Sequence, residues 1–171
     1  MSFLKSSKDE EFSAIGPSRP LDLSCYGAER GSGDRREIMS LSIEELAGQY
    51  HEAWADLDPD TIVALHTEDS TFHLHGMAEP AVGREAVRGL IASLVTLVPD
   101  LHFAAKRGYL GTDHIVLEYD MSETFSETHF VCDGVDVFSV VNGLMARKDS
   151  YLDLATLVNQ IGSLPKVGVS V

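Results

Sequence analysis

Apolar residues recur every three or four positions in the first half of the chain, and this spacing predicts amphipathic helices. The first helix is expected to begin at a capping box formed by Ser42 and Glu45. Pro99 is expected to end the last of these helices, because the residue before a proline disfavours helical geometry. The elements expected before Pro99 are, in order, a helix over 42–57, a short helix from Asp58-Pro59 to about His66, a strand over 71–75, a loop over 76–80 and a helix over 84–98.

After Pro99 the apolar period changes to two, which predicts β-strands. The strands are expected over 101–106, 114–125, 130–141 and 144–154, followed by a final helical turn over 155–161. Asn142-Gly143 between two apolar runs predicts a tight hairpin, because both residues accept the positive φ of a type I′ turn. This order of elements predicts an α+β fold in which helices pack on one face of a curved sheet.

The last hairpin, Gly134–Asp153, carries charged residues at pleat-matched positions of an apolar region. Alternation places two groups of residues on one face each: Asp136, Phe138 and Val140 on the first strand, and Arg147, Asp149 and Tyr151 on the second. Apolar β-rich regions normally exclude charge, so these residues indicate a pocket.

Residues 1–40 are polar and rich in Gly, Ser and Pro without a sustained period, which predicts a flexible N-terminal extension before a domain over 41–171. Cys25 and Cys132 are the only cysteines, so no disulfide framework is indicated and a reducing compartment fits. The chain has no run of about 20 apolar residues and no export signal, so we expect a cytoplasmic protein. Its formal net charge of −14 disfavours nucleic acid as a partner.

Two segments resemble the nuclear-transport-factor-2-like superfamily, in its SnoaL-like and ketosteroid-isomerase-like branches. The first is Tyr50–Thr71, YHEAWADLDPDTIVALHTEDST, and the second is the final hairpin, VDVFSVVNGLMARKDSYLD. The resemblance covers about residues 41–162 and implies a cone-shaped fold whose sheet and three helices enclose an apolar pocket. It also implies a homodimer formed through convex sheet faces.

The resemblance to ketosteroid isomerases implies that Tyr50 and Asp136 donate hydrogen bonds to a dienolate oxygen. An aspartic acid can do so when an apolar site keeps it protonated. The proton-abstracting aspartate of that family is replaced here by Leu74. His73 or His75 could substitute only if a bulge turned one of them inward.

A second resemblance, to limonene-epoxide-hydrolase-like proteins, implies that Asp120 and Asp149 activate water. Arg147 would supply the cation that the family carries on its third strand. Phe72 and Leu74 stand where those enzymes place Tyr and Asn to hold the water.

His73 and His75 also have the spacing of metal ligands on one strand face. We prefer a position for them on the convex face of the sheet or at a dimer interface. Neither a metal nor an organic cofactor is expected. Asp120 and Asp149 are expected to move protons, and Tyr50 and Asp136 to stabilise an oxyanion. The residues expected to bind the substrate are Trp54, Phe72, Leu74, His73, His75, Phe138 and Arg147.

These assignments favour a cofactor-independent isomerase, cyclase or hydrolase acting on a small apolar molecule of polyketide, terpenoid or steroid type. Two alternatives remain open at this point. One is a non-catalytic module that binds such a molecule, and the other is a dimerisation unit whose N-terminal extension carries the function.

Overall fold

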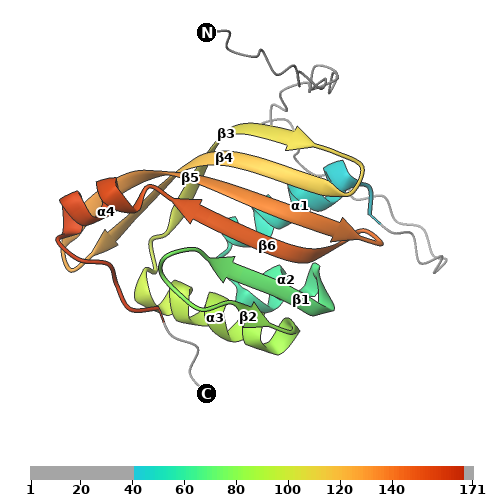
Figure 1. Cartoon of the computed structure of the whole chain (residues 1–171), viewed down its shortest axis with the longest axis horizontal. Coiled ribbons are helices and arrows are strands. Elements are labelled where there is room, and N and C mark those ends of the chain that lie inside the picture. Colours follow the sequence, from blue (N-terminus) through green and yellow to red (C-terminus); the bar gives the residue numbers. More distant parts are fainter. Residues whose placement is uncertain (1–40, 168–171) are drawn as a thin grey trace, which may run out of the picture.

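The computed structural model describes residues 41–167 and shows helices packed against one six-stranded sheet (Figure 1). The strands lie in the order β2-β1-β6-β5-β4-β3, and every neighbouring pair is antiparallel except β1 and β6. Their bounds are β1 His66–Leu74, β2 Ala81–Val82, β3 His102–Leu110, β4 His114–Phe125, β5 Thr128–Val141 and β6 Leu144–Leu152. The expected α+β class is confirmed, whereas the extension expected over 1–40 lies outside the described residues.

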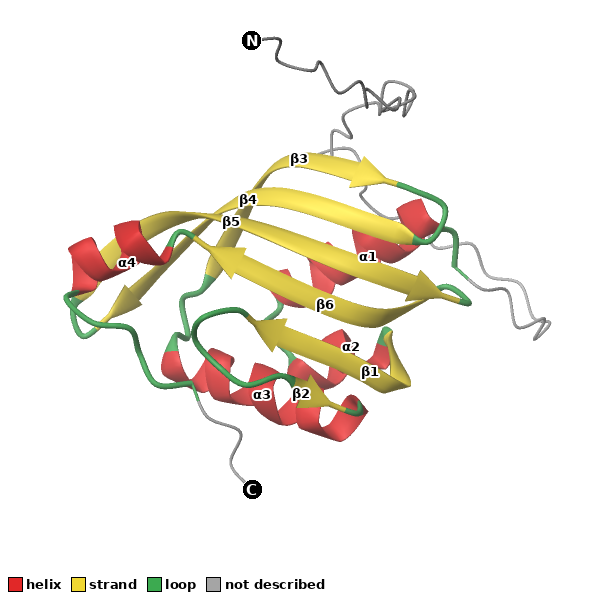
Figure 2. Ribbon diagram, viewed as in Figure 1, coloured by secondary structure: helices red, strands yellow, loops and turns green. Residues whose placement is uncertain are grey.

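Helices α1 (Ile43–Ala55), α2 (Pro59–Ala64) and α3 (Arg84–Leu97) follow the predicted pattern closely. The capping box of Ser42 and Glu45 is present at the start of α1. Figure 2 shows these three helices behind and beside the sheet, and α4 (Leu154–Ile161) at the far end of β5 and β6. The buried stripes of α1 and α3 supply the apolar wall that faces the sheet.

The β5–β6 hairpin forms at Asn142-Gly143 as predicted, with φ values of 51° and 73° at the two residues. Immediately beyond this turn the pairing shifts by one residue. Val140 pairs with Met145, but Ser139 pairs with Arg147, so Ala146 is an extra residue in β6. Such a bulge reverses which side chains of the following residues point to each face of the sheet.

Strand β1 begins at His66, five residues before the predicted start, and its first residue pairs with Met145 on β6. Glu68 and Asp69, which fall between the expected short helix and the expected strand over 71–75, instead lie in this strand with exposed side chains. The pairing partner of His66 is far away in the sequence, so the local pattern could not indicate this extension. Within the described part of the chain, no helix is long and apolar enough to cross a membrane.

Candidate functional site

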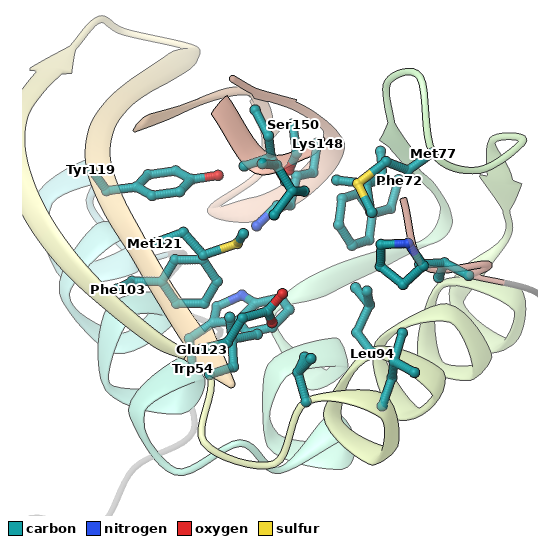
Figure 3. A pocket seen from close by; sticks show the side chains of 18 residues that line it. Trp54, Phe72, Met77, Leu94, Phe103, Tyr119, Met121, Glu123, Lys148 and Ser150 are labelled. Carbon is teal, nitrogen blue, oxygen red and sulfur yellow. The ribbon is translucent and has the colours of Figure 1, made fainter. Parts of the chain in front are cut away.

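A hollow lies between the inner face of the sheet and the helices, and its walls are mainly apolar (Figure 3). It contains about 550 Å³ of empty space, part of it open to solvent. Helix α1 contributes Trp54, α3 contributes Leu94 and Leu97, and the segment after α4 contributes Pro165 and Val167. A second hollow of about 430 Å³ shares four wall residues with the first: Trp54, Phe103, Tyr119 and Lys148.

Lys148 is the most unusual side chain of this interior, because it is a lysine only 3% exposed. Its Nζ lies 2.7 Å from Oδ2 of Asp136. The ammonium also lies over four aromatic rings, with distances to the ring centroids of 4.6 to 5.3 Å; these rings belong to Trp54, Phe72, Tyr50 and Phe138. Cation–π attraction and the carboxylate together compensate the lysine for its lost hydration.

Asp136 connects Lys148 to a third polar group of the interior. The hydroxyl of Tyr119 donates a hydrogen bond of 2.9 Å to Oδ1 of Asp136. Burial, the largest effect, disfavours the charge of Lys148, but Asp136 and Tyr50 together outweigh it and raise the pKa of Lys148 above its ordinary value. Burial, followed by the charge of Asp136, raises the pKa of Tyr119. The lysine is therefore held charged and the tyrosine is held neutral at the polar end of the hollow.

Tyr50 lines the second hollow, which agrees with its expected position in a pocket. Its hydroxyl, however, does not bind Asp136. It hydrogen-bonds Nε2 of His66 over 3.1 Å, whereas Asp136 is bonded by Tyr119. Burial, then the charges of Lys148 and Arg84, lowers the pKa of His66 to about 3. The imidazole is therefore neutral near pH 7 and holds the Tyr50 hydroxyl in place.

Glu123 is a further polar side chain that lines the larger hollow, and it was not among the predicted site residues. It is 5% exposed and shares the inner face of β4 with Tyr119 and Met121. Burial, then the charge of Asp100, raises the pKa of Glu123 to about 7. The only sequence signal for it was its alternation with Tyr119 and Met121 along the strand.

Asp120 lies on the outer face of the sheet rather than in the expected pocket. Its neighbours Tyr119 and Met121 line the hollow, so the pleat turns Asp120 the other way. There its Oδ1 lies 2.6 Å from Nζ of Lys106, which also pairs with Asp133.

Asp149 also lies on the outer face, because the bulge at Ala146 turns Lys148 and Ser150 inward instead. Arg147 binds the carboxylate of Asp149 with two nitrogens, and Nε2 of His75 lies 2.8 Å from its Oδ1. The Arg147 guanidinium, by its hydrogen bond, lowers the pKa of Asp149. The predicted pairing of Arg147 with Asp149 is present, but neither residue lines the hollow.

His73, His75 and Asp149 form a group whose donor atoms lie within 4.8 Å of one another, an arrangement that could hold a metal ion. The two imidazole rings lie 3.6 Å apart, and Tyr151 stacks on His75 at 4.1 Å. Since Arg147 already places its positive charge on Asp149, a cation would have to displace it. No bulge turns either histidine inward, because the irregularity in β1 precedes Thr71.

The structure thus divides the predicted site residues between two faces of the sheet. Those that line the hollows are Tyr50, Trp54, Phe72, Leu74, Asp136 and Phe138. Those that lie on the outer face are His73, His75, Asp120, Arg147 and Asp149. The polar residues of the hollows that the sequence analysis missed are Lys148, Tyr119, Glu123, Ser150 and His51.

Comparison with solved structures places this fold among ketosteroid-isomerase-like and nuclear-transport-factor-2-like proteins. A protein with a ketosteroid isomerase-like fold from Catenulispora acidiphila, in complex with trimethylamine, is 20% identical, with a TM-score of 0.65, and the match covers 72% of this chain and 96% of that one. A candidate SnoaL-like polyketide cyclase from Shewanella putrefaciens is 15% identical, with a TM-score of 0.61 and coverage of 70% and 84%. TerC, co-crystallised with polyporic acid, is 16% identical, with a TM-score of 0.62 and coverage of 70% and 98%.

A search of the curated proteins found no match. The family comparison, in contrast, matches the SnoaL-like domain over residues 47–148, a span that runs from α1 through Lys148 and includes Asp136, Tyr119 and Glu123. This chain therefore belongs to the SnoaL-like domain family.

Proposed function

We propose that this protein is a cofactor-independent acid/base enzyme that acts on a small, largely apolar molecule of polyketide, terpenoid or steroid type. The observation that carries the proposal is the charged Lys148 inside an apolar hollow. An ammonium has three N–H donors, and among the described residues the Asp136 carboxylate and the Tyr50 hydroxyl are the hydrogen-bonding partners of Lys148. A donor therefore remains for an oxygen atom of a ligand.

In this proposal a ketone or enol oxygen of the ligand lies against Lys148. A fixed positive charge in a water-poor site stabilises the negative charge that develops on such an oxygen during proton transfer. Asp136 keeps the lysine charged, and Tyr119 holds Asp136 in place. The complexes of two proteins of similar fold, one with trimethylamine and one with polyporic acid, support a small-molecule ligand for this fold.

The test uses 2-tetralone, a bicyclic ketone, and tetralin, which has the same skeleton without the oxygen. We expect the protein to bind 2-tetralone more tightly than tetralin and to accelerate exchange of its C–H hydrogens in D₂O, followed by ¹H NMR. Lys148→Met, which has a similar length without the charge, is expected to lose both effects. Binding without accelerated exchange would instead identify a non-catalytic binding module, and equal binding of the two compounds would refute the role of Lys148.

We also propose that the protein forms a homodimer through the outer face of the sheet. Val137 and Tyr151 lie on this face and are 37% and 47% exposed, which is unusual for large apolar side chains on a central part of a sheet. Light scattering is expected to give the mass of two chains, and Val137→Lys is expected to give the mass of one. A single-chain mass for the unaltered protein would refute the dimer.

A further inference from the structure

Glu123 has no evident structural purpose. Its side chain is buried, and among residues 41–167 it makes no hydrogen bond and no ion pair. Its carboxyl oxygens are not among the fully buried side-chain atoms of the described residues, so they face the open space of the hollow that Glu123 lines. A carboxyl that lacks a protein partner and opens on a hollow is available to a ligand, since the polar groups of a protein interior are nearly always satisfied.

The position of Glu123 relative to Lys148 matters as much as its burial. Both residues line the same hollow, Glu123 from β4 and Lys148 from β6 (Figure 3). They do not neutralise each other, since Lys148 pairs with Asp136 on the intervening strand β5. The hollow thus offers a ligand a positive donor at one place on its wall and a carboxyl at another.

The other titratable groups around Glu123 do not fit a proton-transfer role at neutral pH. Burial raises the pKa of the Cys132 thiol on β5 to about 11, and burial also raises that of Tyr119. Asp100, in the loop before β3, is exposed and accepts a hydrogen bond from the backbone of Thr124. The parts of α3 and α4 that line the hollow are apolar.

We propose that Glu123 is the catalytic residue that transfers the proton in this cavity, taking it from a carbon next to the carbonyl group whose oxygen is bound by Lys148. This inference rests on the proposed function and names the reaction class, which is enolisation of a ketone. The C–H bond breaks and its proton goes to the Glu123 carboxylate. The electron pair forms the C=C bond, and the carbonyl π pair moves to the oxygen as an enolate beside Lys148. Return of a proton from Glu123 to carbon completes the cycle.

The acidity of Glu123 supports this role. A general base works best when its pKa lies near the working pH, and that of Glu123 is raised to about 7 by burial and by Asp100. Both the carboxylate that accepts a proton and the acid that returns it are then populated near neutrality.

The experiment measures exchange of 2-tetralone in D₂O for the full chain, Glu123→Gln, Glu123→Asp and the control Glu118→Gln. Glu118 lies on the same strand but on the outer face, where it pairs with Arg107 over 2.9 Å. We expect Glu123→Gln to slow exchange by about 100-fold or more while the affinity for 2-tetralone stays unchanged. Glu118→Gln is expected to match the unaltered chain, and Glu123→Asp, which keeps the carboxyl, to retain part of the activity.

The pH profile gives a readout that a purely structural role would not affect. Exchange by the unaltered chain is expected to rise with pH and to level off above about 7, whereas the remaining exchange in Glu123→Gln should lack this step. Full activity in Glu123→Gln, with activity lost in Lys148→Met, would overturn the role of Glu123 and leave the proposed function intact. Loss of 2-tetralone affinity in Glu123→Gln would also overturn it, and no exchange by the unaltered chain would overturn the proposed function itself.

Discussion

Replacing Glu123 by glutamine is expected to stabilise the fold, and the gain should grow with pH. Burial and Asp100 raise the pKa of Glu123 from 4.5 to about 7, so between these values the folded chain keeps a proton that the unfolded chain has released. The contribution of this group to stability is therefore fully present below pH 4.5 and is lost as the pH rises through 7. Glutamine, which does not titrate, escapes this loss.

The size of the effect follows from the two pKa values. At about 1.4 kcal/mol per pKa unit, the loss is about 1 kcal/mol at pH 5.5, one unit above the unfolded value. It reaches about 3 kcal/mol at pH 8.5, above both pKa values, where the full difference between them counts. The advantage of glutamine over glutamate in the free energy of unfolding is thus expected to grow by about 2 kcal/mol between these conditions.

Urea denaturation of both proteins at each pH measures this difference directly. Other titrating groups cancel, because the two chains are compared at the same pH. Glu118→Gln serves as the control and should show no comparable growth, since its carboxylate is on the outer face. A difference between Glu123→Gln and the unaltered chain that stays constant from pH 5.5 to 8.5 would refute the raised pKa and the burial argument with it.

Three further substitutions examine the rest of the site. Lys148→Met leaves Asp136 buried without its cation and should lower the free energy of unfolding by about 3 to 5 kcal/mol. The double variant that adds Asp136→Leu should recover part of this loss. A loss below about 1 kcal/mol, measured by urea denaturation, would contradict the buried ion pair. Gly134→Ala places a methyl group 2.3 Å from Cε2 of Tyr119 and should displace the tyrosine ring. We expect the free energy of unfolding to fall by about 1 to 3 kcal/mol and 2-tetralone exchange to slow. Unchanged stability and exchange would show that the ring adapts freely. Asp120→Asn should change stability by no more than about 0.5 kcal/mol and leave exchange unaffected, and loss of exchange would return the chemistry to the outer face.

Most of the fold could be predicted because its signals are local. The capping box of Ser42 and Glu45, the helix stop at Pro99 and the Asn142-Gly143 turn each depend on a few neighbouring residues. The start of β1 at His66 could not be predicted in this way, because its pairing with β6 depends on a residue far along the chain.

The site was predicted less completely, and the bulge at Ala146 accounts for part of the difference. Alternation correctly grouped Arg147 with Asp149, but a regular hairpin would have placed Arg147 opposite Phe138, where the structure has Lys148. A bulge of one residue leaves no clear signal in the sequence. A nearly fully buried lysine is also contrary to the usual distribution of that residue, so hydrophobic patterning could not indicate it.

The extra residue in β6 makes the identity of the interior depend on which residue of the hairpin is left unpaired. With Ala146 unpaired, Arg147 lies opposite Ser139 and Lys148 lies opposite Phe138, on the inner face. If Ala146 instead paired with Ser139, the strand would slip by one residue, Arg147 would turn inward and Lys148 would turn outward. Deletion of Ala146, by contrast, would remove the bulge and leave both of these pairs in place, so an inward Lys148 does not require the full length of this hairpin.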